Sequence, residues 1–231
     1  MRRLSGRGVR ARALCFTAVA VLVGGCSNGS GKGDRREPNT DVAADRICDG
    51  TFDSAAAAAL RRLSGTDRFD ELSGTSEAGE PNAFSLSRAV KHLHDEYLKQ
   101  SACRVYKSGD ESGTLFLEVR FSASSNHPAS SEKQSGGDRV RYPLGVFAQA
   151  GLYGADLFFR CETKPTSENA AIGSTNYVKA EMTAAANRMR GDSVNKDRMV
   201  VLNSMARAVA EDAGCTSSAA LPTQVPEAKD S

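Results

Sequence analysis

The spacing of hydrophobic residues divides the chain into four segments. Residues 13–23 form a predominantly apolar run that is too short to cross a bilayer as a helix of the mature protein. Residues 26–45 are rich in Gly, Ser and charged side chains and have no periodicity, which predicts a flexible tether. Residues 46–218 switch between helical and strand-like spacing and are long enough for a single domain with its own core. Residues 219–231 contain Pro, Ala and Glu and are expected to be disordered.

The domain is expected to open with an Ala-rich helix. Residues 55–63 are dominated by Ala and Leu, and Gly65 is placed to end the helix. Asp53 or Ser54 precedes this stretch and can accept hydrogen bonds from its first free N–H groups.

Two more stretches have the spacing of amphipathic helices. Residues 86–98 follow the N-cap candidate Ser85 and place their apolar side chains on one stripe. The last helix is centred on residues 199–209, with Asp197 near its start and Gly214 as its C-terminal stop.

The pattern between these helices predicts strands. Residues 114–122 alternate most clearly, because every second side chain is a large apolar one. Further strands are expected from residue 103 to a turn at 109–113, at 139–142 and at 155–161. Residues 177–189 are ambiguous: the alternation over 177–183 favours a strand, whereas residues 184–189 also fit a helix. Residues 123–138 are rich in Ser and Gly and predict a long loop. This order of elements predicts an α+β fold in which helices pack on one face of an antiparallel sheet.

Two aromatic side chains fall on the other face of that sheet. Phe116 and Phe158 alternate with apolar residues that are assigned to the core. Aromatic rings on a face without helices can mark a binding surface, but a covering loop or helix layer is the more frequent reason for them. We treat both residues as a candidate binding surface.

The charge balance changes once the apolar run is treated as a signal. The whole chain has 30 basic and 28 acidic residues, but five of the arginines and no acidic residue lie before Cys26. The remainder therefore carries 25 basic and 28 acidic residues, a formal net charge of −3. Such a chain has no general attraction for nucleic acid, which we exclude as a partner.

The residues around Cys26 indicate where the protein is located. Five arginines, the apolar run and the sequence Val-Gly-Gly-Cys at residues 23–26 together resemble a bacterial lipoprotein signal. Residues 1–25 would then be the signal peptide, and the thiol of Cys26 would carry the lipid. The resemblance implies a protein anchored by Cys26 on the extracytoplasmic face of the cell membrane.

Four cysteines remain after Cys15 of the signal and Cys26 are set aside. Cys48, Cys103, Cys161 and Cys215 are an even set in an exported protein, which predicts two disulfides. Three pairings are open, and we prefer Cys48–Cys103 with Cys161–Cys215 because each bond would join a helix end to a strand end in one half. The absence of closely spaced cysteine pairs disfavours the alternative, a four-cysteine zinc site.

Few residues qualify for catalysis. His92 and His94 are two positions apart, so on a helix their rings diverge and cannot share a metal. His127 lies in the predicted loop. Acidic residues cluster in a segment rich in small residues, where solvation is their usual role: Asp67, Asp70, Glu71, Glu77 and Glu80. We therefore expect no enzymatic activity, no metal and no cofactor.

Most of the mature chain is similar to uncharacterised secreted lipoproteins of actinomycetes. The features shared are the lipobox, the Gly/Ser tether, the Cys-Asp-Gly opening at residues 48–50 and the late Val-Ala-Glu-Asp-Ala-Gly-Cys sequence at residues 209–215. The resemblance implies the location and the disulfides, and it implies no catalytic residue.

The leading functional hypothesis is a non-enzymatic, membrane-tethered domain that binds a protein partner or a component of the cell envelope. The alternative is a small-molecule-binding accessory lipoprotein of a transporter or sensor. A third hypothesis, an envelope hydrolase, lacks a recognisable catalytic set. A deep pocket between sheet and helices would favour the small-molecule binder, and a flat aromatic patch at Phe116 and Phe158 would favour the partner binder.

Overall fold

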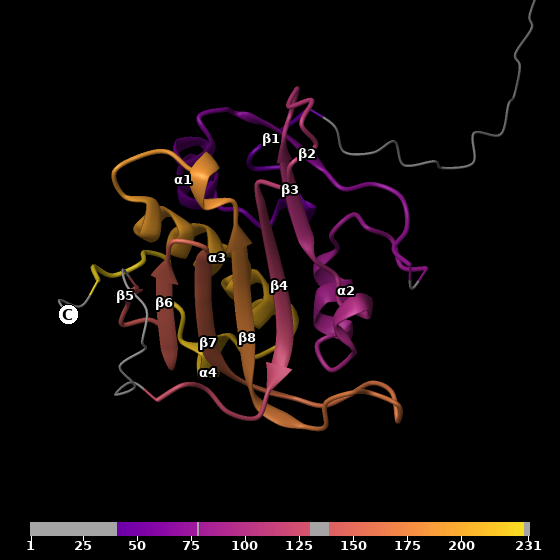
Figure 1. The fold of residues 1–231 in the computed structure, drawn as a ribbon. Coiled ribbons are helices and arrows are strands. Elements are labelled where there is room, and N and C mark those ends of the chain that lie inside the picture. Colours follow the sequence, from indigo (N-terminus) through magenta and orange to yellow (C-terminus); the bar gives the residue numbers. More distant parts are fainter. Residues whose placement is uncertain (1–40, 78, 130–138, 229–231) are drawn as a thin grey trace, which may run out of the picture. The chain divides into compact units, whose positions relative to one another are not determined.

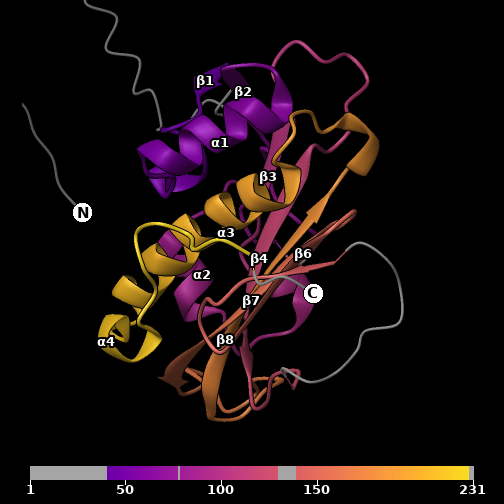
Figure 2. The ribbon, with the colours of Figure 1, turned by 90° about the vertical axis from the view of Figure 1, so that its left-hand side faces the viewer.

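The computed structural model describes residues 41–77, 79–129 and 139–228. The predicted signal peptide 1–25, the lipid site Cys26 and nearly all of the predicted tether lie outside these ranges. The described chain forms an antiparallel sheet of eight strands with helices packed on one face, as the hydrophobic pattern predicts (Figures 1 and 2).

The strands are β1 (Val42–Ala43), β2 (Arg68–Glu71), β3 (Cys103–Lys107), β4 (Leu117–Ser124), β5 (Val140–Arg141), β6 (Phe147–Gly151), β7 (Gly154–Thr163) and β8 (Thr175–Ala184). The helices are α1 (Ser54–Ser64), α2 (Leu86–Lys91), α3 (Val194–Asp212) and α4 (Thr216–Ala219). Short 3₁₀ turns cover Cys48–Gly50, Tyr97–Lys99 and Ala186–Arg188. The order across the sheet is β1-β2-β3-β4-β8-β7-β6-β5, and each neighbouring pair is antiparallel.

Helix α3 organises the core. It packs on β6, β7 and β8 and also contacts α1, α2 and α4, so it connects the sheet with the other helices (Figure 2). The fully buried residues of α3 include Met199, Val201, Leu202, Met205, Ala206 and Val209. Side chains of this size each stabilise the fold by about 1.5–3 kcal/mol when they are fully removed from water. The apolar stripe predicted for the last helix is therefore the centre of the core.

The predicted ends of α1 are confirmed. Asp53 accepts a hydrogen bond from the Ala56 N–H at 2.9 Å, and Gly65 has a left-handed φ of 71°. The backbone N–H of Gly65 donates to the Arg61 carbonyl at 2.8 Å, which closes the last turn.

The prediction of one helix over residues 86–98 is only half right. Ser85 caps α2 as expected, but the helix ends at Lys91. The next residues form backbone bonds to distant segments instead: the carbonyl of Leu93 accepts from Ala123 on β4, and the carbonyl of His94 accepts from Ile172. These tertiary bonds replace the helical ones that the apolar stripe predicted.

Strands β4, β7 and β8 lie where alternation predicted them, but β6 does not. The expectation was a Gly-containing link between residues 142 and 155. All five residues of β6 are buried, so the strand shows no alternation of apolar and polar side chains. The signal for a strand was therefore missing.

The folded domain also extends past both predicted limits, 46 and 218. The strand β1 pairs with β2, and Ala44 is fully buried, within the segment assigned to the tether. In the segment assigned to a disordered tail, the Pro222 carbonyl accepts a hydrogen bond from Asn203 at 2.8 Å, and Val225 is buried. Short segments flanking the core carry too few residues to show a periodicity.

The two disulfides are Cys48–Cys103 and Cys161–Cys215, the pairing preferred among the three. Cys48 lies in the 3₁₀ turn before α1, and Cys103 begins β3. Cys161 lies on β7, and Cys215 follows α3. With all four sulfurs in disulfides, a four-cysteine zinc site is excluded.

Candidate ligand pocket

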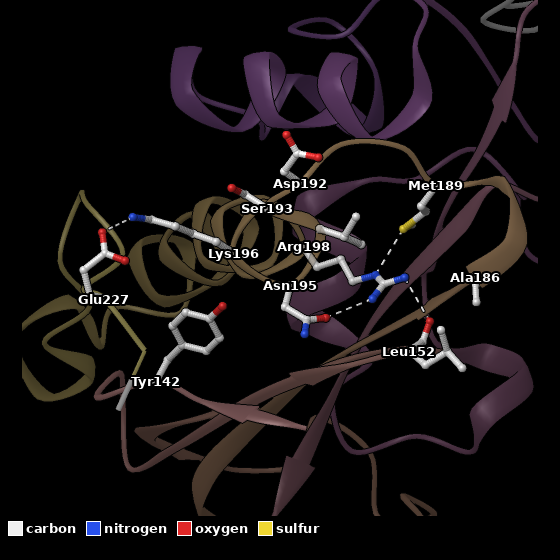
Figure 3. Close-up of a pocket in the computed structure, with 11 residues that line it drawn as sticks. Tyr142, Leu152, Ala186, Met189, Asp192, Ser193, Asn195, Lys196, Arg198 and Glu227 are labelled. Atoms are coloured by element: carbon white, nitrogen blue, oxygen red, sulfur yellow. Dashed lines mark hydrogen bonds and ion pairs between the residues drawn. The ribbon is translucent and has the colours of Figure 1, made fainter. Parts of the chain in front are cut away.

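A pocket of about 520 Å³ lies beside the first turn of α3 (Figure 3). The turn between β6 and β7, the end of β5 and the C-terminal segment contribute the other sides. Its lining includes Tyr142, Leu152, Met189, Asn195, Arg198 and Glu227. The pocket joins residues that are more than 80 positions apart in the sequence.

Arg198 is the largest fully buried side chain of the described chain, with 1% of its surface exposed. Its Nη2 donates to the Leu152 carbonyl at 2.9 Å, and its Nη1 donates to the Gly151 carbonyl and to the Asn195 Oδ1. Nε contacts the Met189 sulfur at 3.1 Å. These contacts fix the guanidinium between α3 and the β6–β7 turn.

None of the ion pairs within the described residues gives Arg198 a carboxylate partner. Burial lowers the pKa of the guanidinium, because the charged form is taken out of water. Arginine stays charged despite such a shift. The pocket therefore has a buried positive charge whose contacts among the described residues are neutral oxygen atoms and a sulfur.

Tyr142 lies on the opposite side of the pocket. Only 6% of the residue is exposed, and its backbone N–H donates to the Ala148 carbonyl at 3.1 Å. Burial, followed by the nearby charges of Glu227 and Asp197, raises the pKa of its hydroxyl. The hydroxyl is therefore a hydrogen-bond donor at neutral pH.

The outer part of the pocket carries charges of both signs. Lys196 forms an ion pair with Glu227, whose side chain is largely exposed, and Asp192 lies near the start of α3 (Figure 3). The neighbouring Asp197 is buried, but it is paired with Arg62 at 2.5 Å on the α1 side.

The aromatic surface expected at Phe116 and Phe158 is not exposed. Phe116 is 1% exposed and lies beneath the Lys107 Nζ, which is 4.8 Å from the ring centroid. Phe158 is 7% exposed and contacts the edge of Phe147, at 5.8 Å between ring centroids. Neighbouring side chains cover both rings, which agrees with the covering alternative and leaves no exposed aromatic patch at these two residues.

The histidines lie apart from the pocket. His92 Nδ1 is 2.6 Å from Asp95, and His94 Nδ1 contacts the carbonyls of Ile172 and Gly173. His94 is 3% exposed and lies after the end of α2, so its environment is not the helix surface on which the sequence placed it. In the part of the chain that the structure describes, no group of three His, Cys, Asp or Glu side chains is arranged to hold a metal.

Glu71 has a structural role that the sequence did not indicate. The residue is 5% exposed, and its carboxylate accepts hydrogen bonds from the backbone N–H groups of Cys48 and Phe84. Asp70 accepts from the Asp41 N–H at 2.6 Å. These carboxylates hold backbone segments together and do not converge on a cleft.

A second hollow, of about 560 Å³, lies beside the Cys161–Cys215 bond. Its charged lining residues, Arg160 and Glu162, are exposed. The Tyr142–Arg198 pocket differs because two of its polar side chains are buried.

Sequence reasoning missed both of these residues. Arg198 precedes Met199 and lies four positions before Leu202, so it falls on the apolar stripe of the predicted helix. A charged residue at a position that the helical pattern assigns to the core was the signal that could have identified Arg198. The sequence contained no such signal for Tyr142, because aromatic residues are common in strands.

The comparisons with known proteins assign no relative: no protein-family model, no curated protein and no solved structure matches the chain. Among the described residues, no helix combines the length and the apolar character needed to span a membrane.

Proposed function

We propose that the protein is a non-enzymatic lipoprotein, anchored by a lipid on Cys26 outside the cell membrane, whose domain binds a small polar molecule in the Tyr142–Arg198 pocket. The observation that carries the binding function is the buried, uncompensated charge of Arg198 in the wall of that pocket. Leaving a charge without a carboxylate partner is costly for stability, and such costs are characteristic of functional sites.

The location is supported by the residues around Cys26 and by the cysteine chemistry. The arginines and the apolar run precede Val-Gly-Gly-Cys in the order of a lipoprotein signal. The two disulfides suit an oxidising compartment outside the cytoplasm.

The structure changes the order of the two binding hypotheses. The aromatic patch at Phe116 and Phe158 that would have supported a partner binder is buried. A pocket between α3 and the sheet connections supports a small-molecule-binding accessory lipoprotein of a transporter or sensor.

One observation still supports the binding of a protein partner. Leu152 and Tyr153 at the β6–β7 turn are 57% and 74% exposed, and Leu152 also lines the pocket. Two large exposed apolar side chains at the rim of a ligand pocket could contact the transporter or sensor that receives the ligand.

Replacing Cys26 with Ala tests the anchor. We expect Cys26→Ala to move the protein from the membrane fraction to the extracytoplasmic soluble fraction without a change in melting temperature, because Cys26 precedes the folded domain. Cys15→Ala is the matched control and should leave the protein in the membrane fraction. Equal membrane retention of the Cys26 variant would overturn the lipid anchor.

Native mass spectrometry of the released Cys26→Ala protein tests the binding function. We expect a fraction of the molecules to carry an additional small mass that disappears under denaturing conditions. A protein that carries no such mass, and acquires none from an extract of small molecules of its host, would contradict the small-molecule function.

A further inference from the structure

The first turn of α3 offers hydrogen-bond donors to the pocket. The N–H groups of Val194, Asn195 and Lys196 have no partner within the helix, and no backbone or side-chain acceptor among the described residues contacts them. The side chain of the N-cap residue Ser193 makes no capping bond. The helix is 19 residues long, so its dipole adds partial positive charge at this end.

The second and independent observation is the hydroxyl of Tyr142. The residue is buried and lines the pocket, yet no acceptor or donor within the described chain contacts its hydroxyl group. Figure 3 shows the hydroxyl directed toward the first turn of α3. The hydroxyl oxygen is not among the fully buried unpaired polar atoms, so it opens into the pocket and is free to bond a solute there.

Arg198 adds a full positive charge to these donors. A guanidinium has five N–H bonds, and the contacts with Leu152, Gly151, Asn195 and Met189 use four of them. The remaining N–H on Nη2 has no acceptor within the described residues. Because only 1% of Arg198 is exposed, the guanidinium acts on an anion in the pocket mainly through its charge.

We propose that the pocket binds the oxyanion group, carboxylate or phosphate, of a small solute through the first-turn N–H groups of α3, the Tyr142 hydroxyl and Arg198. This inference rests on the proposed binding function and assigns its chemistry. All the donors named are positive or polarised toward a negative ligand, whereas a neutral solute would leave the charge of Arg198 uncompensated.

The acidic residues at the rim limit the ligand. Glu227 is paired with Lys196, and Asp192 is exposed beside Ser193. A ligand with negative charge at both ends would meet these carboxylates. The proposal therefore favours a solute with its oxyanion at one end and a neutral or positive group at the other.

The test uses the Cys26→Ala protein labelled with ¹⁵N and its backbone amide resonances. Sodium phosphate and sodium acetate are the probes, and sodium chloride at equal ionic strength is the control. We expect at least one probe to cause saturable shifts of the Val194, Asn195 and Lys196 amides, which chloride does not reproduce. Saturation by phosphate alone or by acetate alone identifies which oxyanion the site selects.

Tyr142→Phe removes the hydroxyl and keeps the ring. Because a hydrogen bond to a charged group is lost, we expect the dissociation constant of the active probe to rise by about tenfold or more. Tyr177→Phe is the matched control, since Tyr177 lies outside this pocket, and it should bind like the parent protein. Both variants are checked for folding by their amide spectra.

Two results would overturn the inference. One is the absence of saturable shifts with either probe, and the other is an equal affinity of the Tyr142→Phe and parent proteins. If native mass spectrometry then finds a neutral molecule bound to the protein, the anion chemistry fails while the binding function stands. If no small molecule binds at all, both fail.

Discussion

Arg198 illustrates at the residue scale how a side chain can conflict with the element that carries it. Its position belongs to the apolar stripe of α3, where an uncharged side chain would pack without the cost of desolvating a charge. Three protein oxygens and a sulfur satisfy most of its donors, but no carboxylate balances its charge within the described residues. A ligand of opposite charge would explain why the guanidinium lies there.

Glu118 on β4 is a contrasting charged residue, because two arginines balance its charge. It contacts Arg104 at 2.6 Å and Arg120 at 2.9 Å. Burial acts to raise the pKa of Glu118, but Arg120 and Arg104 together outweigh it and hold the pKa below its ordinary value of 4.5. The ionised carboxylate therefore stabilises the fold above pH 4.5, and this contribution is lost as the pH falls through the lowered folded-state pKa.

We predict that Glu118→Gln lowers the free energy of unfolding by about 1–3 kcal/mol at pH 7, because charge-assisted hydrogen bonds are lost. The variant should also lose less stability than the parent protein when the pH falls below 4.5. Urea unfolding at pH 7 and at acid pH measures both effects. Glu181→Gln, at a more exposed carboxylate on β8, is the control and should change little. An unchanged acid dependence in Glu118→Gln would contradict this account.

At the scale of elements, the start of β7 after the β6–β7 turn lies very close to the backbone of β8. A Cβ on Gly154 would lie 1.9 Å from the Met182 carbonyl oxygen of β8, far inside contact distance. We predict that Gly154→Ala lowers the free energy of unfolding by about 1–3 kcal/mol or more, because backbone atoms would have to move. Chemical denaturation measures the change. Gly173→Ala, where a Cβ would meet nothing within 4 Å, should be close to neutral, and equal effects would refute the close-approach explanation.

The elements also show what the sequence could predict. Strands β4 and β8 have one buried face each, so alternation located them, and Asp53 and Gly65 carried recognisable capping chemistry. By contrast, β6 is buried throughout, and α2 is cut short by bonds from β4 and from residue 172. Local sequence patterns identify elements that have one solvent-exposed face. They fail where contacts with distant segments determine the secondary structure.

For the whole molecule, the fold class and the disulfide pairing could be predicted, but the candidate site could not. The order of helices and strands was sufficient to predict an α+β fold with helices on one face of the sheet. The pocket depends on Tyr142, Leu152, Arg198 and Glu227, which only the assembled topology brings together. Phe116 and Phe158 had the correct strand alternation for an open face, yet neighbouring side chains bury them.

The intact mass of the protein extracted from membranes tests the central claim, that this is an exported, lipid-anchored and disulfide-bonded domain. We predict a chain that begins at Cys26, carries covalent lipid and weighs four hydrogens less than its fully reduced form, since two disulfides are closed. A chain that retains Met1, has no lipid and shows no deficit of hydrogen would contradict the account.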